Sequence, residues 1–445
     1  MSNRSATIPN GPASLRSASR ASRRLATSAA VAFTPTPSSR PSLVIEDTPI
    51  GRLRPDPANP RRISAAVLDQ LERSFAEFGF VQPILARRAD RVVIGGHQRL
   101  VVARRRGLRR VPVIWLDISR EQARLLGLAL NKISGEWDEQ LLARLLAELD
   151  ALPELNLAAS GFLDTEVKTL LRSLDARDKR ERPESFDLDA ALEAARRTHR
   201  VQPGELWALG DHRLACGDAT NGSDVERLLG GTKAAMAFTD PPYNVGLGDH
   251  GGQGRDARRR RIANDALDPA AWEAFSAAWA GVLVGAVDGA MYVCMSSKEW
   301  PTVARALEAA GGHWSDTLIW WKDRFTLGRS DFQRQYEPIW YGWPEGSDHW
   351  FAGDRAQSDV WSIPRPAISN LHPAMKPLAL IERALDLGSR LGERVLDPFA
   401  GSGSTLIACE RTGRLAAVLE LDPTYADVIL ARWEAFTGGQ ASRVA

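Results

Sequence analysis

The sequence has no long hydrophobic run and very little cysteine. No continuous apolar stretch in its 445 residues approaches the roughly 18 residues that cross a bilayer, so we predict no membrane-spanning helix. Its three cysteines, Cys216, Cys294 and Cys409, lie far apart and form no CxxC pair. This spacing excludes a disulfide framework and gives no pattern for a zinc or other metal site. We therefore predict buried, reduced thiols and a cytosolic protein.

Acidic residues are missing from the beginning of the chain. No Asp or Glu precedes Glu46, whereas Arg, Ser, Ala and Pro are frequent. Such a composition cannot build a hydrophobic core, so residues 1–42 are predicted to be a disordered tail. An organellar transit peptide has the same composition and stays open as an alternative.

A strong charge imbalance is also missing. The formal net charge is only +2, which by itself does not indicate a nucleic-acid partner. A local arginine cluster in a glycine-rich stretch is the better indication, and we predict that it contacts DNA phosphates. A solvated charge run is the alternative. The cluster consists of Arg255, Arg258, Arg259, Arg260 and Arg261.

The apolar pattern divides the chain into two structured parts. In residues 43–150, short strands and helices alternate in a compact α+β pattern. Residues 151–203 are dense in charge and predicted to form a helical linker. In residues 204–438, apolar strands alternate with helices, which predicts a mostly parallel α/β sheet. Residues 439–445 are predicted to be a tail.

A short motif follows one of the predicted strands. Asp240, Pro241, Pro242 and Tyr243 come directly after the apolar run 234–239. The carboxylate and a prolyl carbonyl can accept hydrogen bonds from an exocyclic amino group, while the tyrosine ring can stack on a planar base. The motif therefore predicts a site that holds a flipped base. A core position for Tyr243 is the alternative.

A second motif has the chemistry of a cofactor site. It is a strand that runs into a glycine-rich turn and then a helix, and such a turn lets a ligand approach the backbone N–H groups at the helix start. The residues concerned are Asp397, Phe399, Gly401, Gly403 and Ser404. The next strand ends at Glu420, with Asp422 just beyond, which places an acid where ribose hydroxyls would bind. The pattern predicts a nucleoside-containing cofactor.

These motifs, taken in order, resemble the β group of amino-methylating DNA methyltransferases. The matching stretches are Gly217-Asp218, Asp240-Pro241-Pro242-Tyr243, His372-Pro373-Ala374-Met375-Lys376-Pro377, the turn 397–404, residues 420–425 and Arg432-Trp433-Glu434. The resemblance implies a Rossmann-like, S-adenosylmethionine-dependent methyltransferase sheet. It also implies S-adenosyl-L-methionine as cofactor and double-stranded DNA as partner, in the cytoplasm of a bacterium at the nucleoid.

The resemblance further implies a role for each matching residue. Asp218 would contact the adenine amine of the cofactor, Glu420 its ribose, and Lys376 its methionine carboxylate. The glycine turn 397–404 would form its binding wall, and residues 240–243 would hold the target base. The plainer alternatives are helix caps for Asp218 and Glu420 and a surface charge for Lys376.

Asp240 bears on which base is modified. Family members with Asp at this position mostly act on adenine and those with Ser mostly on cytosine. We therefore predict direct methyl transfer to N6 of adenine, as in a restriction-modification enzyme, with cytosine N4 as the alternative. Target recognition is expected near residues 324–370. A ParB-like DNA-binding or regulatory protein with an inactive methyltransferase half stays open as a different class.

Residues 43–150 resemble the ParB/sulfiredoxin-like N-terminal domain. The matching stretches are Asn59-Pro60-Arg61, Gly79-Phe80-Val81-Gln82-Pro83-Ile84, Ile94-Gly95-Gly96-His97-Gln98-Arg99 and Val111-Pro112-Val113. A strand that ends at Gly95-Gly96 before a helix predicts a phosphate cradle with Arg99 as counter-charge, and hence a nucleotide or DNA as ligand. Where the family has a Gly-Glu-Arg-Arg box, this chain reads Gly96-His97-Gln98-Arg99, so nucleotide hydrolysis is not expected. A homodimer is kept open as the assembly.

Overall fold

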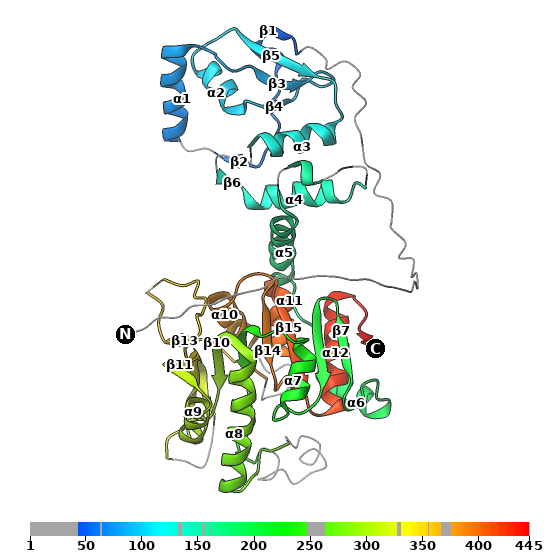
Figure 1. Cartoon of the computed structure of the whole chain (residues 1–445), viewed down its shortest axis with the longest axis vertical. Helices are drawn as coiled ribbons and strands as arrows, with labels where there is room; N and C mark the ends of the chain where they lie inside the picture. Colours follow the sequence, from blue (N-terminus) through cyan, green and yellow to red (C-terminus); the bar gives the residue numbers. More distant parts are fainter. Residues whose placement is uncertain are drawn as a thin grey trace, which may run out of the picture.

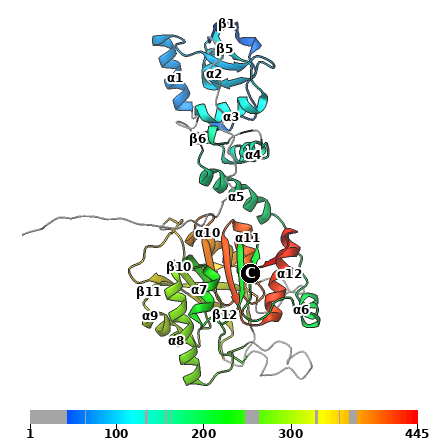
Figure 2. The same ribbon diagram turned by 45° about the vertical axis from the view of Figure 1, so that its right-hand side comes forward.

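The molecule has two structured units joined by a helical linker. The structure is a computed structural model that describes residues 43–62, 65–131, 136–153, 155, 157–160, 162–246, 263–326, 331–354, 356–365 and 375–444. Figures 1 and 2 show a small N-terminal unit (residues 43–150) at one end, a larger C-terminal unit (residues 204–444) at the other, and helix α5 (Asp164–Arg180) between them. Within these described ranges, no helix is long and apolar enough to cross a membrane.

A four-stranded sheet in the order β1-β5-β3-β4 forms the centre of the N-terminal unit. Its strands are β1 (Ile45–Pro49), β3 (Ile84–Arg87), β4 (Val93–Gly95) and β5 (Arg110–Leu116). The other elements are η1 (Ile50–Arg52), α1 (Ala65–Phe78), α2 (His97–Arg105), α3 (Arg120–Asn131), α4 (Glu139–Asp150) and the ribbon of β2 (Arg61–Arg62) with β6 (Glu136–Trp137). Apolar residues at alternate strand positions, such as Ile84, Ala86, Val111 and Val113, form its core.

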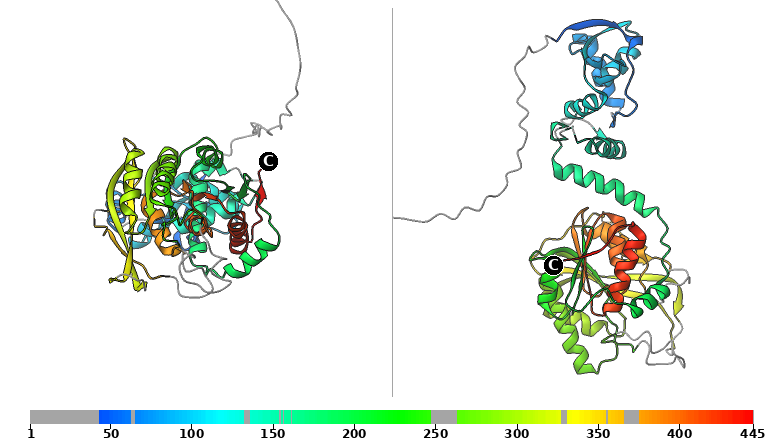
Figure 3. Two further views of the ribbon diagram at one scale, coloured as in Figure 1. Left: turned by 90° about the horizontal axis from the view of Figure 1, so that it is seen from below. Right: turned by 90° about the vertical axis from the view of Figure 1, so that its right-hand side faces the viewer.

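The linker is helical and packs on both units. It contains η2 (Leu157–Ser160), α5 and α6 (Leu188–Arg197). Val167, Leu170 and Leu171 of α5 pack against the apolar cluster of α3 and α4. Further along, α5 lies against α11 (Ser404–Thr412) of the C-terminal unit, as the right-hand view of Figure 3 also shows. The linker is therefore a docked element of the fold.

The C-terminal unit is built on a ten-stranded sheet in the order β13-β11-β12-β10-β9-β14-β15-β8-β7-β16. The strands are β7 (Leu206–Leu209), β8 (His212–Cys216), β9 (Ala234–Thr239), β10 (Val287–Cys294), β11 (Gly312–Thr326), β12 (Arg334–Pro344), β13 (Val360–Ser362), β14 (Arg394–Asp397), β15 (Leu415–Glu420) and β16 (Ser442–Arg443). The central strands β10, β9, β14, β15 and β8 are parallel. The predicted parallel sheet is thus confirmed at the centre, whereas β12 and β7 pair antiparallel with their neighbours there.

Helices cover both faces of this sheet. Helices α7 (Gly222–Leu229), α8 (Pro269–Ala286) and α9 (Trp300–Ala309) pack on one face. Helices α10 (Leu378–Gly388), α11 and α12 (Pro423–Thr437) pack on the other face. The central strands read as nearly continuous apolar runs because both of their faces are buried.

Candidate active site

The functional motifs meet along one edge of the parallel sheet. Strands β9, β14, β15 and β8 are neighbours in that order, so their carboxyl ends lie side by side. Asp240 follows β9, the glycine turn follows β14, Glu420 ends β15 and Asp218 follows β8. The backbone N–H of Gly217 donates to the carbonyl of Glu420 at 3.0 Å, which ties the ends of β8 and β15 together. Ligands of open parallel sheets bind at this edge.

The glycine turn has a backbone that only glycine adopts without strain. Gly403 has a φ of +85° and directly precedes α11. A Cβ at Gly403 would lie 3.1 Å from Ile429, so a side chain would be crowded as well as strained. In the first part of the turn, the ring of Phe399 packs edge-on against the ring of Trp279, at a distance of 5.7 Å between the ring centroids. The turn is therefore fixed in shape, with the N–H groups of Phe399, Gly401 and Gly403 paired within the protein.

Asp397 supports this turn from inside the protein. Its Oδ1 accepts from the Thr239 hydroxyl at 2.8 Å and from the Phe399 N–H at 3.1 Å, and its Oδ2 accepts from the Thr405 hydroxyl at 2.6 Å. Burial raises the pKa of Asp397 to about 6 in spite of these bonds. Both carboxylate oxygens thus hold β9 and α11 on the turn. Direct contact of Asp397 with a cofactor stays a prediction.

The acids after β15 and β8 are also held by local hydrogen bonds. Glu420 accepts from the N–H of Gly401 at 2.8 Å and from the N–H of Asp422 at 3.0 Å. Asp422 in turn caps α12, because its Oδ1 accepts from Thr424 N–H at 2.8 Å. Asp218 Oδ1 accepts from the backbone and hydroxyl of Thr220. A carboxylate offers about four acceptor positions, so Glu420 and Asp218 can accept further bonds from a ligand.

A buried ionic network surrounds Asp240. The ammonium of Lys376 lies 2.6 Å from Asp240 Oδ2, 3.0 Å from the Tyr243 hydroxyl and 3.2 Å from Glu337 Oε2. Burial acts to lower the pKa of Lys376, but the attraction of Asp240 and Glu337 raises it above its usual value. Burial raises the pKa of Asp240, although Lys376 opposes this shift. The lysine therefore holds the carboxylate in place and favours its charged form.

The other oxygen of Asp240 has no donor. Among the described residues, Oδ1 is buried and accepts no hydrogen bond. A buried acceptor without a partner is rare and costs about 1–3 kcal/mol, so it needs an explanation. The side chain as a whole is 27% exposed, so part of it faces the sheet edge, while the Oδ1 atom itself is covered. Oδ1 is thus an acceptor that fits a donor from a ligand.

Two residues of this network were not predicted from the sequence. Glu337 of β12 accepts from the Tyr243 hydroxyl at 3.1 Å and from Lys322 of β11 at 2.5 Å. Burial alone would raise the pKa of Glu337, but Lys376 and Lys322 together lower it to about 2. Both ammonium groups also face the ring of Trp320. One sign of Lys322 was available in the sequence. This lysine lies two residues after Trp320 and four after Leu318, so it is on the same buried face of β11 as these two apolar residues.

The remaining predicted site residues are placed as follows. Pro241 is buried and Pro242 is half-buried, directly after Asp240. Ser404 is buried, and its hydroxyl accepts from Arg432 at 3.2 Å. The predicted phosphate contacts Arg255, Arg258, Arg259, Arg260 and Arg261 lie outside the described residues. The three cysteines are buried and free, as predicted, and no metal-binding cluster occurs among the residues that the structure describes.

A second candidate site lies in the N-terminal unit. Gly96 precedes α2 with a φ of +94°, but the predicted counter-charge Arg99 donates to the carbonyls of Gln82 and Pro83 at 2.8 and 3.0 Å. A cavity of about 180 Å³ lies nearby. Its charged and polar lining includes Asp56, Asn59, Arg87, Asp90, His97, Arg120 and Arg124. Arg87 and Arg124 are paired with Asp90 and Glu148, so Arg120 is the remaining lining arginine that a ligand anion could meet without displacing one of these carboxylates.

The fold is an α/β domain whose candidate site residues lie along the carboxyl edge of a parallel sheet. Residues 234–431 match the N6/N4 family described as DNA methylase, and residues 37–132 match the family described as ParB N-terminal domain. The C-terminal unit therefore belongs to the N6/N4 DNA methylase family and the N-terminal unit to the ParB N-terminal domain family. The predicted combination of a Rossmann-like methyltransferase sheet with a smaller α+β ParB-like domain is confirmed.

Individual relatives are distant. The Type II methyltransferase M.HpaI of Haemophilus parainfluenzae is 24% identical over 253 residues, which cover 52% of this chain and 76% of M.HpaI. The Type II methyltransferase M.ScaI of Streptomyces caespitosus is 34% identical over 86 residues, which cover 18% of this chain and 28% of M.ScaI. The crystal structure of the M1.HpyAVI-SAM complex has a TM-score of 0.38 and 21% identity, and covers 49% of this chain and 98% of that one.

Proposed function

We propose that this protein transfers a methyl group from S-adenosyl-L-methionine to the exocyclic N6 amine of a flipped adenine in double-stranded DNA. The observation that supports this most is Asp240 Oδ1, a buried acceptor that no donor among the described residues reaches, at the same sheet edge as the glycine turn of a DNA methylase domain. An exocyclic amine has two hydrogens, and this oxygen can accept one of them. The two prolines next to Asp240 have backbone carbonyls that can accept the other hydrogen of the amine, and they have no backbone N–H group.

The residues at the sheet edge fit the proposed cofactor. The glycine turn lies at the same sheet edge as Glu420 and Asp218, and these two acids keep further acceptor positions for a ribose and an adenine amine. When bound there, the cofactor would supply an electrophilic methyl group. The sulfonium is already activated, so the chain has mainly to orient the amine and stabilise charge.

The Asp240 network would act on the amine during transfer. The amine nitrogen would become positively charged as the methyl group leaves the sulfonium sulfur, which becomes a neutral thioether, and the ionised Asp240 beside it would stabilise that charge until the nitrogen loses a proton to Asp240 or to water. Lys376 keeps Asp240 in its charged form, and Glu337 and Lys322 hold Lys376 and the Tyr243 hydroxyl in place. The Tyr243 ring can then stack on the flipped base, which offsets part of the cost of about a few kcal/mol for extruding it.

The proposed cofactor role of Glu420 predicts a pH dependence. Burial raises the pKa of Glu420 to about 7, so the carboxyl is half protonated near neutral pH. The ionised form accepts ribose hydroxyls best, and binding below this pKa would require the loss of a proton. We expect cofactor affinity to fall by up to about tenfold per pH unit as the pH drops below this value. Calorimetric titrations on both sides of pH 7 test this, and Glu420→Gln should bind weakly without the pH dependence. A wild-type affinity that is flat across this range would contradict the role.

Adenine is proposed over cytosine because of the aspartate at position 240. The alternative, N4 of cytosine, presents the same kind of exocyclic amine, and the Asp240 oxygen would accept from either. Transfer of a labelled methyl group to DNA, followed by nucleoside digestion and mass analysis, decides between them. We expect N6-methyladenine. N4-methylcytosine would replace the base assignment, and no incorporation into any DNA by folded protein would favour the DNA-binding or regulatory alternative.

For the N-terminal unit we propose a nucleotide or a DNA backbone as ligand. The cavity near His97 supports this, because Arg87, Arg120 and Arg124 line it, although Arg87 and Arg124 are paired with Asp90 and Glu148 and a ligand anion would have to compete with these carboxylates. A homodimer and a location at the bacterial nucleoid stay predictions.

A further inference from the structure

A fully buried arginine lies behind the glycine turn of the proposed cofactor site. Arg432 of α12 is 1% exposed. Its Nη1 donates to the carbonyl of Ser402 at 2.9 Å and to the Ser404 hydroxyl at 3.2 Å, and it lies 3.5 Å from the Met375 sulfur. One guanidinium nitrogen thus contacts both sides of Gly403 and the residue before Lys376. A buried guanidinium is stable only when it is paired with a counter-charge.

The counter-charge comes from the linker. Glu184, between α5 and α6, accepts from Arg432 Nε at 2.5 Å and from Nη2 at 3.0 Å. These two parallel hydrogen bonds form a bidentate arginine–carboxylate pair, which is stronger and more directional than a single neutral hydrogen bond. The Glu184 side chain is only 9% exposed. It lies outside residues 234–431, which match the methylase family.

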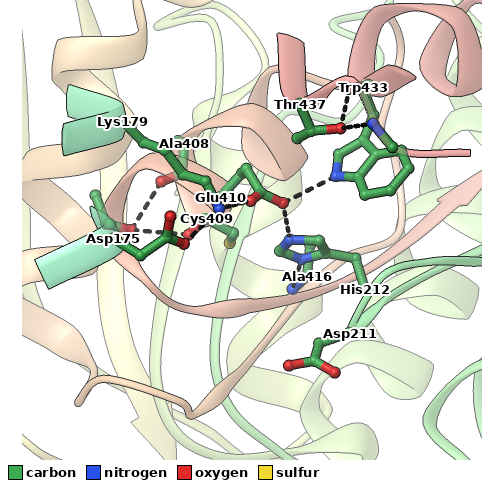
Figure 4. Close-up of polar contacts among 12 residues, drawn as sticks. Asp175, Lys179, Asp211, His212, Ala408, Cys409, Glu410, Ala416, Trp433 and Thr437 are labelled. Atoms are coloured by element: carbon green, nitrogen blue, oxygen red, sulfur yellow. Dashed lines mark hydrogen bonds and ion pairs between the residues drawn. The ribbon is translucent and has the colours of Figure 1, made fainter. Parts of the chain in front are cut away.

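Further contacts hold the part of the linker that directly precedes Glu184. Arg411 of α11 donates to the carbonyls of Arg180 and Arg182 at 2.8 and 3.1 Å. Directly before Arg180, Lys179 forms an ion pair with Glu410 of α11, as Figure 4 shows. Since the other end of α5 packs on α4, these contacts also connect the cofactor turn to the N-terminal unit.

Glu410 forms a buried cluster with Lys179, His212 and Trp433, which we call the Glu410 cluster. Its side chains make no hydrogen bond to the glycine turn among the described residues. Glu410 accepts from Trp433 Nε1 at 2.8 Å and lies 2.6 Å from His212 Nε2 (Figure 4). His212 Nδ1 accepts from the N–H of Ala416 at 2.8 Å, which assigns the proton to Nε2. This cluster fastens the linker to α11 and α12, but none of its hydrogen bonds among the described residues reaches the Ser402 carbonyl or the Ser404 hydroxyl. It provides a matched control.

We propose that Glu184 is a positioning residue for the cofactor. It orients Arg432, and Arg432 in turn sets the Ser402 carbonyl and the Ser404 hydroxyl on either side of Gly403. The linker is therefore part of the methyltransferase site, and the position of the linker and the affinity for cofactor are coupled in both directions. This inference rests on the proposed function, since it takes the glycine turn to bind S-adenosylmethionine.

The test uses the full chain with Glu184→Gln. The substitution removes the counter-charge and leaves Arg432 free to shift. We expect the Kd for S-adenosylmethionine to rise about tenfold, which corresponds to the loss of roughly one hydrogen bond to a charged group. The KM for the cofactor should rise in parallel, whereas kcat at saturating cofactor should stay within about twofold of wild type, because Asp240 is untouched.

Two further variants separate positioning from stability. Lys179→Met breaks a buried ion pair of the linker and should lower the melting temperature without changing the cofactor Kd at a temperature where it is folded. The double variant E184Q/R432M removes the buried charge together with its partner, so stability should recover relative to E184Q. Its cofactor Kd should stay raised, because the donors to Ser402 and Ser404 are gone.

Each outcome bears on one proposal. If E184Q does not fold, the double variant gives the answer through its Kd. A Kd equal to that of wild type in E184Q, or in the double variant, overturns the positioning role. A rise in Kd for Lys179→Met as large as that for E184Q overturns it as well, because any loosening of the linker would then suffice. A wild-type chain that binds no S-adenosylmethionine contradicts the proposed function itself.

Discussion

Asp240→Asn is expected to reduce methyl transfer by at least about 10²–10³-fold, the effect of removing one preorganised group that stabilises charge in a transition state. The amide keeps the size of the carboxylate but cannot carry its negative charge, and its NH₂ group faces either the base amine or Lys376. The glycine turn and Glu420 belong to neighbouring strands and are not altered. The Kd for S-adenosylmethionine should therefore stay within about twofold of wild type.

The measurement pairs single-turnover methyl transfer with cofactor titration. Asp218→Asn is the matched control, because it changes an acid after β8, which is separated from β9 by β14 and β15 at the same sheet edge, where the cofactor is proposed to bind. We expect the opposite pattern from it, with a raised cofactor Kd and a nearly normal rate at saturating cofactor. If Asp240→Asn transferred methyl groups at the wild-type rate, the assignment of Asp240 to the target amine would be wrong.

The centre of the catalytic unit could be predicted from the sequence. Strands β9 and β14 have the bounds expected from their apolar runs, and the motifs that follow them lie at the same sheet edge. This succeeded because strands buried on both faces are continuously apolar and because parallel neighbours must end together. The glycine turn was predictable for a similar reason, since its backbone at Gly403 excludes other residues.

The polar network around Asp240 could be predicted only in part. Glu337 and Lys322 meet Lys376 only because β11 and β12 pair with Trp320 opposite Glu337. Such a register is set by packing in the folded sheet and by a turn whose geometry the sequence does not specify. Glu184 is a similar case. A charged linker gives no sign that one of its carboxylates lies against a buried arginine more than two hundred residues away.

Lys376→Met is expected to change the pH dependence of the reaction. Burial already raises the pKa of Asp240, and Lys376 is the group whose charge opposes that shift. Without the ammonium, the pKa of Asp240 should rise further, so more of the carboxyl is protonated at neutral pH and unable to stabilise a positive amine. Activity should fall by about 10²-fold at neutral pH and recover by up to about tenfold per pH unit as the pH is raised.

This prediction separates two roles for the lysine. If Lys376 instead neutralises the methionine carboxylate of the cofactor, as the family resemblance implies, Lys376→Met should raise the cofactor Kd and leave the pH profile of the transfer step unchanged. The matched control is Lys322→Met, which removes the other ammonium beside Glu337 but leaves the 2.6 Å contact of Lys376 with Asp240 intact. We expect it to have a smaller effect on rate and the wild-type pH profile. The contacts of Lys376 with Asp240, Tyr243 and Glu337 favour the first role, because Asp240 and Tyr243 are the residues proposed to hold the target base and Glu337 is bonded to Tyr243.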